Sequence, residues 1–244
     1  GILSKNNIYP NRLSWQNNML QRSYDNYTAV REDISNMTWP KHDKFTLNII
    51  VDDYEKGIKP AIELLQKSGI MKNRGVIQAG GHCGLYPYAF TEFFDMIFTF
   101  EPNALSFHCL VNNCQGENII KMNVALGKST GRVKSFSVAS NNTGMNQVKD
   151  SENDVYYVPM IALDSLALTD IDLIELDLEG YEYDALLGAK ETIERNKPVL
   201  IIENATDEIK QFLSTLGYVE WKKINRLDIL FVLESDLELL NKSQ

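Results

Sequence analysis

Residues 172–182 constrain the fold most, because they place carboxylates at every second position of a segment that otherwise has the pattern of a buried strand. The two residue types alternate, Ile174, Leu176 and Leu178 with Glu175, Asp177 and Glu179. In an extended segment this alternation puts the acids on one face. Gly180 ends the strand, and apolar residues at helical spacing follow at once. Asp177 and Glu179 are therefore predicted at the carboxyl end of a strand that feeds a helix, where ligands bind in open α/β sheets.

Two interpretations of these acids stay open. Burying an unpaired carboxylate is costly, so a solvated cleft or a polar ligand would explain their presence. Alternatively, they mark a solvated strand end whose acids favour the N-terminus of the next helix.

From residue 75 onward, strand and helix patterns alternate. Strands are predicted at 75–80, 96–101, 118–125, 171–178 and 198–203, and helices at 86–95, 104–113, 181–195 and 206–216. Such alternation implies βαβ units and a mainly parallel sheet. Two β-rich pieces, 132–140 and 154–163, interrupt the middle.

The chain changes character near residue 75, which predicts an N-terminal extension at 1–74 and a main domain at 75–244. The extension has 11 basic and 8 acidic residues, whereas the rest has 13 and 25. Within it we expect a helical arm over about 1–44, a short strand at 45–51 and a helix at 54–65. The arm is predicted to pack on a partner subunit, which would make a homo-oligomer, or to cover the substrate cleft; packing against its own domain is the alternative.

Two strand-like runs at 218–224 and 227–233 are separated only by Asn225 and Arg226. This connection is too short for a parallel crossover, so the runs must form an antiparallel hairpin. A parallel sheet closed by such a hairpin is typical of Rossmann-like methyltransferases. It disfavours a nicotinamide dehydrogenase, which normally continues with another parallel unit.

A glycine-rich turn follows the first strand of the main domain. Gly80, Gly81 and Gly84 allow a sharp turn and a close approach of backbone to ligand, although such turns also make ordinary connections. Glu101 follows about 20 residues later at the end of the next strand, the spacing at which an acid can bind ribose hydroxyls.

With these motifs, residues 75–233 resemble an FkbM-family methyltransferase. The matching segments are Gln78–Gly84, Phe100–Pro102, Asn123–Gly127, Leu163–Leu166, Asp177–Glu182 and Pro198–Glu203. The resemblance implies a seven-stranded, mainly parallel Rossmann-like methyltransferase sheet and S-adenosyl-L-methionine as cofactor. It implies cofactor contacts from Gln78, Gly80, Gly81, His82, Gly84, Glu101, Pro102, Asn103, Val124, Ala125 and Asp177.

Three positions depart from the family pattern. Gln78 replaces the usual acid and His82 the usual Asn, and Glu175 stands where the family often has Lys. We expect Asp177 and Glu179 to orient cofactor and acceptor, with one of them accepting a proton. His82 is a further candidate base, or a local hydrogen-bonding residue in the Asn position.

The expected activity is O-methylation of a sugar or another small natural product. A catalytically inactive binding or assembly module of the same fold is the alternative. No ligand spacing demands a metal ion and none is predicted, although a run of acids could hold a divalent cation. The net charge of −9 argues against nucleic-acid or membrane partners. Three cysteines form neither a paired framework nor a zinc spacing, which favours a reducing, cytoplasmic compartment.

Overall fold

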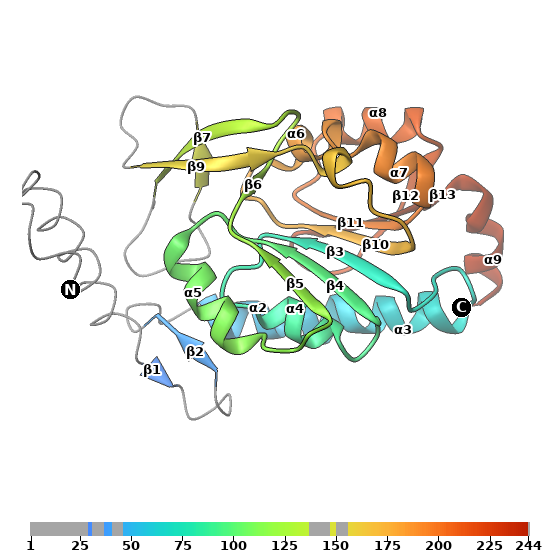
Figure 1. Cartoon of the computed structure of the whole chain (residues 1–244). Helices are drawn as coiled ribbons and strands as arrows, with labels where there is room; N and C mark the ends of the chain where they lie inside the picture. Colours follow the sequence, from blue (N-terminus) through green and yellow to red (C-terminus); the bar gives the residue numbers. More distant parts are fainter. Residues whose placement is uncertain (1–28, 31–36, 41–45, 137–146, 150–155, 244) are drawn as a thin grey trace, which may run out of the picture.

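The computed structural model describes residues 29–30, 37–40, 46–136, 147–149 and 156–243. Its centre is a seven-stranded sheet in the order β12-β13-β11-β10-β3-β4-β5 (Figure 1). The strands are β3 (Gly75–Ala79), β4 (Met96–Phe100), β5 (Ile119–Met122), β10 (Ile171–Leu176), β11 (Val199–Glu203), β12 (Tyr218–Lys223) and β13 (Asp228–Leu233). Only β13 runs against its neighbours. The predicted mainly parallel sheet and its C-terminal hairpin are confirmed.

Helices cover both faces of this sheet (Figure 1). On one face lie α2 (Thr46–Asp53), a π-helical turn (Tyr54–Ile58), α3 (Lys59–Lys67), α4 (Leu85–Phe90) and α5 (Ala104–Asn113). On the other lie α6 (Glu182–Leu187), α7 (Lys190–Asn196) and α8 (Asp207–Thr215), and α9 (Leu237–Lys242) ends the chain. Because both faces are covered, the central strands are buried on both sides and mostly apolar.

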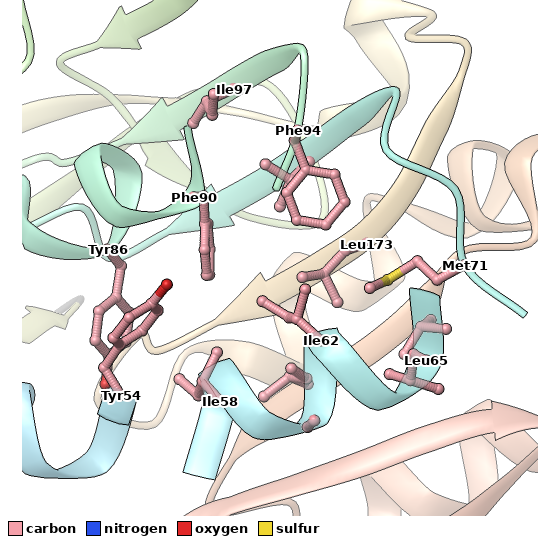
Figure 2. Close-up of a cluster of buried hydrophobic side chains, with 14 of the residues drawn as sticks. Tyr54, Ile58, Ile62, Leu65, Met71, Tyr86, Phe90, Phe94, Ile97 and Leu173 are labelled. Carbon is pink, nitrogen blue, oxygen red and sulfur yellow. The ribbon is translucent and has the colours of Figure 1, made fainter. Parts of the chain in front are cut away.

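The core on the first face joins the N-terminal helices to the sheet. Figure 2 shows Ile62 of this region beside Leu173 of β10, and Tyr54 beside Tyr86. The Tyr54 and Tyr86 rings lie 5.8 Å apart between centroids. Residues 46–67 therefore pack on the sheet itself. The division of the chain into an extension at 1–74 and a main domain at 75–244 stays a prediction.

The predicted strand at 45–51 is wrong, because helix α2 occupies Thr46–Asp53. The β-branched residues Ile49, Ile50 and Val51 favour a strand locally. Leu47 and Tyr54, however, are seven residues apart and both buried, which is the spacing of one helix face. Packing of that face decides the conformation. The predicted helix at 54–65 is confirmed, as the π-helical turn followed by α3.

Trp39 anchors the segment before α2. It belongs to the short antiparallel pair of β1 (Ala29–Val30) and β2 (Thr38–Trp39). Its side chain is 1% exposed and packs with Leu47, Cys83 and Cys109. The Asn113 side chain donates to the carbonyls of Thr38 at 2.8 Å and Cys83 at 2.7 Å. Most of the predicted arm lies outside the described residues.

The interruption between β5 and β10 forms a second sheet in the order β6-β9-β7-β8. It consists of β6 (Ala125–Leu126), β7 (Gly131–Phe136), β8 (Gln147–Lys149) and β9 (Tyr156–Ile161). The predicted β-rich pieces correspond to β7 and β9. The predicted strand at 118–125 is split, since β5 ends at Met122 and β6 joins the second sheet.

Two predicted helices differ in length. The helix predicted at 86–95 ends at Phe90, and the one predicted at 181–195 is divided between α6 and α7. The division falls at Gly188, whose α-carbon lies against the Gly127 carbonyl with no room for a side chain. Among the helices in the described parts of the chain, none has the length and apolar character needed to span a bilayer.

Candidate active site

A cavity of about 360 Å³ opens at the carboxyl edge of the central sheet. This volume lies within the range of small-molecule and cofactor sites. The lining includes nine of the predicted site residues, Gly80, Gly81, His82, Glu101, Pro102, Val124, Ala125, Asp177 and Glu179. Gln78, Gly84 and Asn103 are not among the lining residues. The loops after β3, β4 and β10 therefore meet at one cavity, as expected for an α/β sheet.

The glycine turn crosses the end of β10. Gly80 has a φ of +83°, and a β-carbon there would overlap the carbonyl oxygen of Asp177. The backbone N–H groups of Gly80 and Gly81 both donate to the Phe100 carbonyl at 3.0 Å. Only glycine satisfies this left-handed conformation together with so close a backbone approach.

Glu101 ties the glycine turn to the end of β4. One carboxylate oxygen accepts from the backbone N–H of His82 at 2.8 Å, and the other from that of Asn103 at 2.7 Å. Burial raises the pKa of Glu101 to about 7, although both backbone hydrogen bonds act in the opposite direction. The side chain is thus fixed at the cavity wall with lone pairs left to accept further donors.

His82 lines the cavity in a strained conformation, with a φ of +47°. Its ring lies edge-on to Trp39, with centroids 5.0 Å apart. The N-terminal segment therefore supports a residue of the cavity wall. Asn103 instead caps α5, because its side-chain oxygen accepts from the backbone N–H groups of Leu105 and Ser106 at 3.0 Å.

Gln78 belongs to a buried polar row inside the sheet. Thr99 donates its hydroxyl to the Gln78 side-chain oxygen at 2.8 Å. The Gln78 amide donates to Glu175 and to the Gly80 carbonyl, each at 3.0 Å. Glu175 is fully buried, and its pKa is raised well above the usual range by burial and then by Asp228. Through the hydrogen bond from Gln78 to the Gly80 carbonyl, this buried row stabilises the glycine turn.

The acids after β10 are brought together by a turn. The predicted strand continues to 178, but β10 ends at Leu176, and Glu179 has a left-handed φ of +51°. Burial raises the pKa of Glu179 to about 7, and burial followed by Glu203 raises that of Asp177 well above its usual range. Glu182 accepts from the backbone N–H groups of Leu178 at 2.7 Å and Gly180 at 3.0 Å. It therefore closes the turn that carries Glu179.

The hairpin and α2 supply a wall that sequence reasoning missed. Asp53, Arg226 and Asp228 line the cavity. The Asn225 side-chain oxygen accepts from the backbone N–H groups of Leu227 at 2.9 Å and Asp228 at 2.8 Å, which shapes the hairpin turn. Arg226 forms an ion pair with Asp53 at 3.4 Å. Asn225 was a visible turn signal, but the approach of α2 depends on tertiary packing.

A comparison with known protein families identifies the class. The sequence pattern of the Methyltransferase FkbM domain matches residues 82–220, more than half of the chain. The protein belongs to the FkbM methyltransferase family, and its fold is the Rossmann-like methyltransferase fold. No curated protein matches the sequence.

Several solved structures are similar at low identity. A methyltransferase FkbM from Methylobacillus flagellatus KT is 16% identical with a TM-score of 0.49; the match covers 90% of this chain and 59% of that one. The chain thus spans less than two thirds of that protein. Magnesium protoporphyrin IX methyltransferase from Synechocystis PCC 6803, solved with bound SAM, is 11% identical with a TM-score of 0.46 and coverages of 88% and 96%.

Proposed function

We propose that the protein transfers a methyl group from S-adenosyl-L-methionine to a hydroxyl oxygen of a sugar or another small natural product. The observation that carries this proposal is the meeting of the glycine turn, Glu101 and Asp177 at one cavity, in a chain of the FkbM methyltransferase family.

The cavity fits the cofactor in three respects. Its volume is in the range of such sites, Gly80 and Gly81 present backbone without side chains, and Glu101 offers carboxylate lone pairs to ribose hydroxyls. Gly81 has little room for a side chain, since a β-carbon would lie 2.5 Å from Leu110 and Thr99. We assign cofactor binding to Gly80, Gly81, His82, Glu101, Pro102, Val124, Ala125 and Asp177. Gln78, Gly84 and Asn103 are assigned supporting positions around them.

Bound S-adenosylmethionine would supply a methyl group on a positively charged sulfur, and the electron pair of the broken carbon–sulfur bond would stay on that sulfur. The protein must place a nucleophilic oxygen in line with that methyl group. It must also accept the hydroxyl proton. Glu179 suits this second role, because its pKa of about 7 lets it exist as a carboxylate near neutral pH. Asp177 and His82 are the other candidate bases at the same wall.

Two measurements test the proposal on the intact chain. Calorimetry with S-adenosylhomocysteine should show saturable binding to the wild-type protein. Incubation with cofactor carrying a labelled methyl group and fractions of small hydroxylated metabolites should transfer the label to an acceptor. Absence of binding at millimolar concentrations would remove the cofactor assignment. Binding without transfer to any fraction would favour the inactive binding module.

A further inference from the structure

Three carboxylates from separate segments converge at the cavity. Asp177 follows β10, Glu182 begins α6, and Glu203 ends β11. One oxygen from each lies within 4.8 Å of one from each of the others. Asp177 and Glu203 line the cavity directly.

None of these three acids forms an ion pair in the described parts of the chain, and the arginine of the same cavity, Arg226, pairs with Asp53 instead. The ion pairs there are formed by other acids, such as Asp53 with Arg226 and Asp172 with Arg74. Backbone N–H groups of Leu178 and Gly180 stabilise Glu182. Within the described residues, no backbone N–H group donates to the Glu203 carboxylate in this way.

Glu203 provides an independent observation. The residue is only 5% exposed, and its Oε2 atom is buried without a hydrogen-bond partner. The backbone of Glu203 is fixed by the sheet, because the residue is paired with Asp228 across β11 and β13. A buried carboxylate oxygen without a donor is unfavourable, since desolvation is not compensated. Its position beside Asp177 points to a ligand that supplies positive charge at the cavity.

We propose that Asp177, Glu182 and Glu203 hold one divalent cation of the oxygen-preferring class, Mg²⁺, Mn²⁺ or Ca²⁺. Oxygen ligands on opposite sides of such an ion are separated by roughly 4 to 5 Å, twice the metal–oxygen distance of about 2.0 to 2.6 Å. The observed spacing satisfies this limit. An all-carboxylate set favours these ions over zinc or copper.

A cation held by these acids would be open to the cavity, because Asp177 and Glu203 line it. Asn204, which follows Glu203, lines the same cavity. Water or an acceptor oxygen would complete its ligand shell, as is usual for Mg²⁺. If the proposed methyl transfer holds, the cation would bind the acceptor hydroxyl and make its proton more acidic. The cation site itself does not depend on that activity.

Manganese binding to the intact chain tests the site without cofactor or acceptor. Titration followed by the electron paramagnetic resonance of free Mn²⁺ should show one saturable site per chain, with Mg²⁺ or Ca²⁺ displacing the metal. Glu203→Gln and Asp177→Asn should each weaken binding at least tenfold. Glu208→Gln is the matched control, because it removes a charge from an exposed position in α8 and should bind like wild type.

Thermal unfolding without metal identifies any variant that fails to fold. If one of the two cluster variants fails, Mn²⁺ binding to the other one tests the site. If the wild type shows no saturable Mn²⁺ binding at millimolar concentration, or if both folded variants bind like wild type, the cation site is overturned. A shared proton between Asp177 and Glu203 would give the first of these results. Loss of methyl transfer alone would not affect the binding measurement, so the two proposals fail separately.

Discussion

The α-carbon of Gly80 lies against the carbonyl oxygen of Asp177, so the turn after β3 and the acid after β10 are built on one backbone contact. The backbone N–H of Asp177 also donates to the Ala79 carbonyl at 3.0 Å. The glycine turn and the acids that follow β10 are therefore in direct backbone contact. A substitution that moves the backbone on one side of this contact should also displace the residues on the other side.

Gly80→Ala should disrupt both stability and cofactor binding. The β-carbon would collide with the Asp177 carbonyl and would also occupy a left-handed conformation. Gly69→Ala is the matched control, because Gly69 has a similar φ of +78° but open space around its α-carbon. The control should cost about 1 to 2 kcal/mol in the free energy of unfolding, and Gly80→Ala clearly more. Equal losses in urea unfolding would show that the contact has no consequence.

Glu101→Ala should weaken binding of S-adenosylhomocysteine by roughly tenfold to a hundredfold, which corresponds to one or two charge-assisted hydrogen bonds. The substitution also releases the backbone N–H groups of His82 and Asn103. Calorimetry should therefore be paired with circular dichroism. An unchanged affinity in the folded variant would rule out ribose recognition by this carboxylate.

The buried Glu101 should also make stability depend on pH. Its pKa is raised from 4.5 to about 7, so the folded state binds the proton more tightly than the unfolded chain. The free energy of unfolding should then fall as pH rises from about 4.5 to about 7, by about 3 kcal/mol from this group. In Glu101→Gln that contribution is absent. Urea titrations at pH 5 and 7.5 measure the difference, and parallel pH profiles of the two proteins would contradict it.

Asp177→Asn and Glu179→Gln should lower turnover more than stability, because both acids face the cavity and neither supports a strand. Asp184→Asn, in the neighbouring helix α6, serves as a control for a nearby loss of charge. For each variant, kcat, KM and the midpoint of thermal unfolding are measured and compared with those of the wild type. Wild-type rates in both cavity variants would assign these acids an architectural role.

The sequence predicted the sheet and much of the candidate site, because both depend on local patterns. Apolar strands and the two-residue connection at Asn225-Arg226 define the sheet and its hairpin. The part of the cavity wall that α2 supplies was missed, because Ile49, Ile50 and Val51 have the residue types of a strand. The burial of Leu47 and Tyr54 on one helix face shows the helix, and it can be seen only in the folded chain. A run of acids able to hold a divalent cation was noted in the sequence, with Glu203 at the end of a neighbouring strand, but the grouping of Asp177, Glu182 and Glu203 was not predicted. It depends on how β10, α6 and β11 pack, and no motif spacing encodes that arrangement.

The start of the folded domain should lie near residue 37, before the position where the sequence motifs begin. Trp39 fills a buried site beside Leu47 and packs on His82, and α3 contributes to the main core. A chain that starts at residue 37 loses only the two-residue strand β1 among the described elements, and it should fold and keep full cofactor affinity. One that starts at 46 should lose roughly 3 to 5 kcal/mol, the scale for removing a buried Trp, and one that starts at 75 should not fold.

Light scattering on the same variants tests the predicted arm. The arm was predicted over about 1–44, and these variants remove its residues 1–36. If that part packs on a partner subunit, the oligomeric state should change when the chain starts at 37; if it covers the substrate cleft, the methyl-transfer rate should change. Trp39→Ala in the intact chain is the control, since it removes the buried contact while keeping the arm. If the chain that starts at 37 keeps both oligomeric state and rate, the arm has neither role. If it fails to fold, the boundary near residue 37 is wrong, because the arm then belongs to the core.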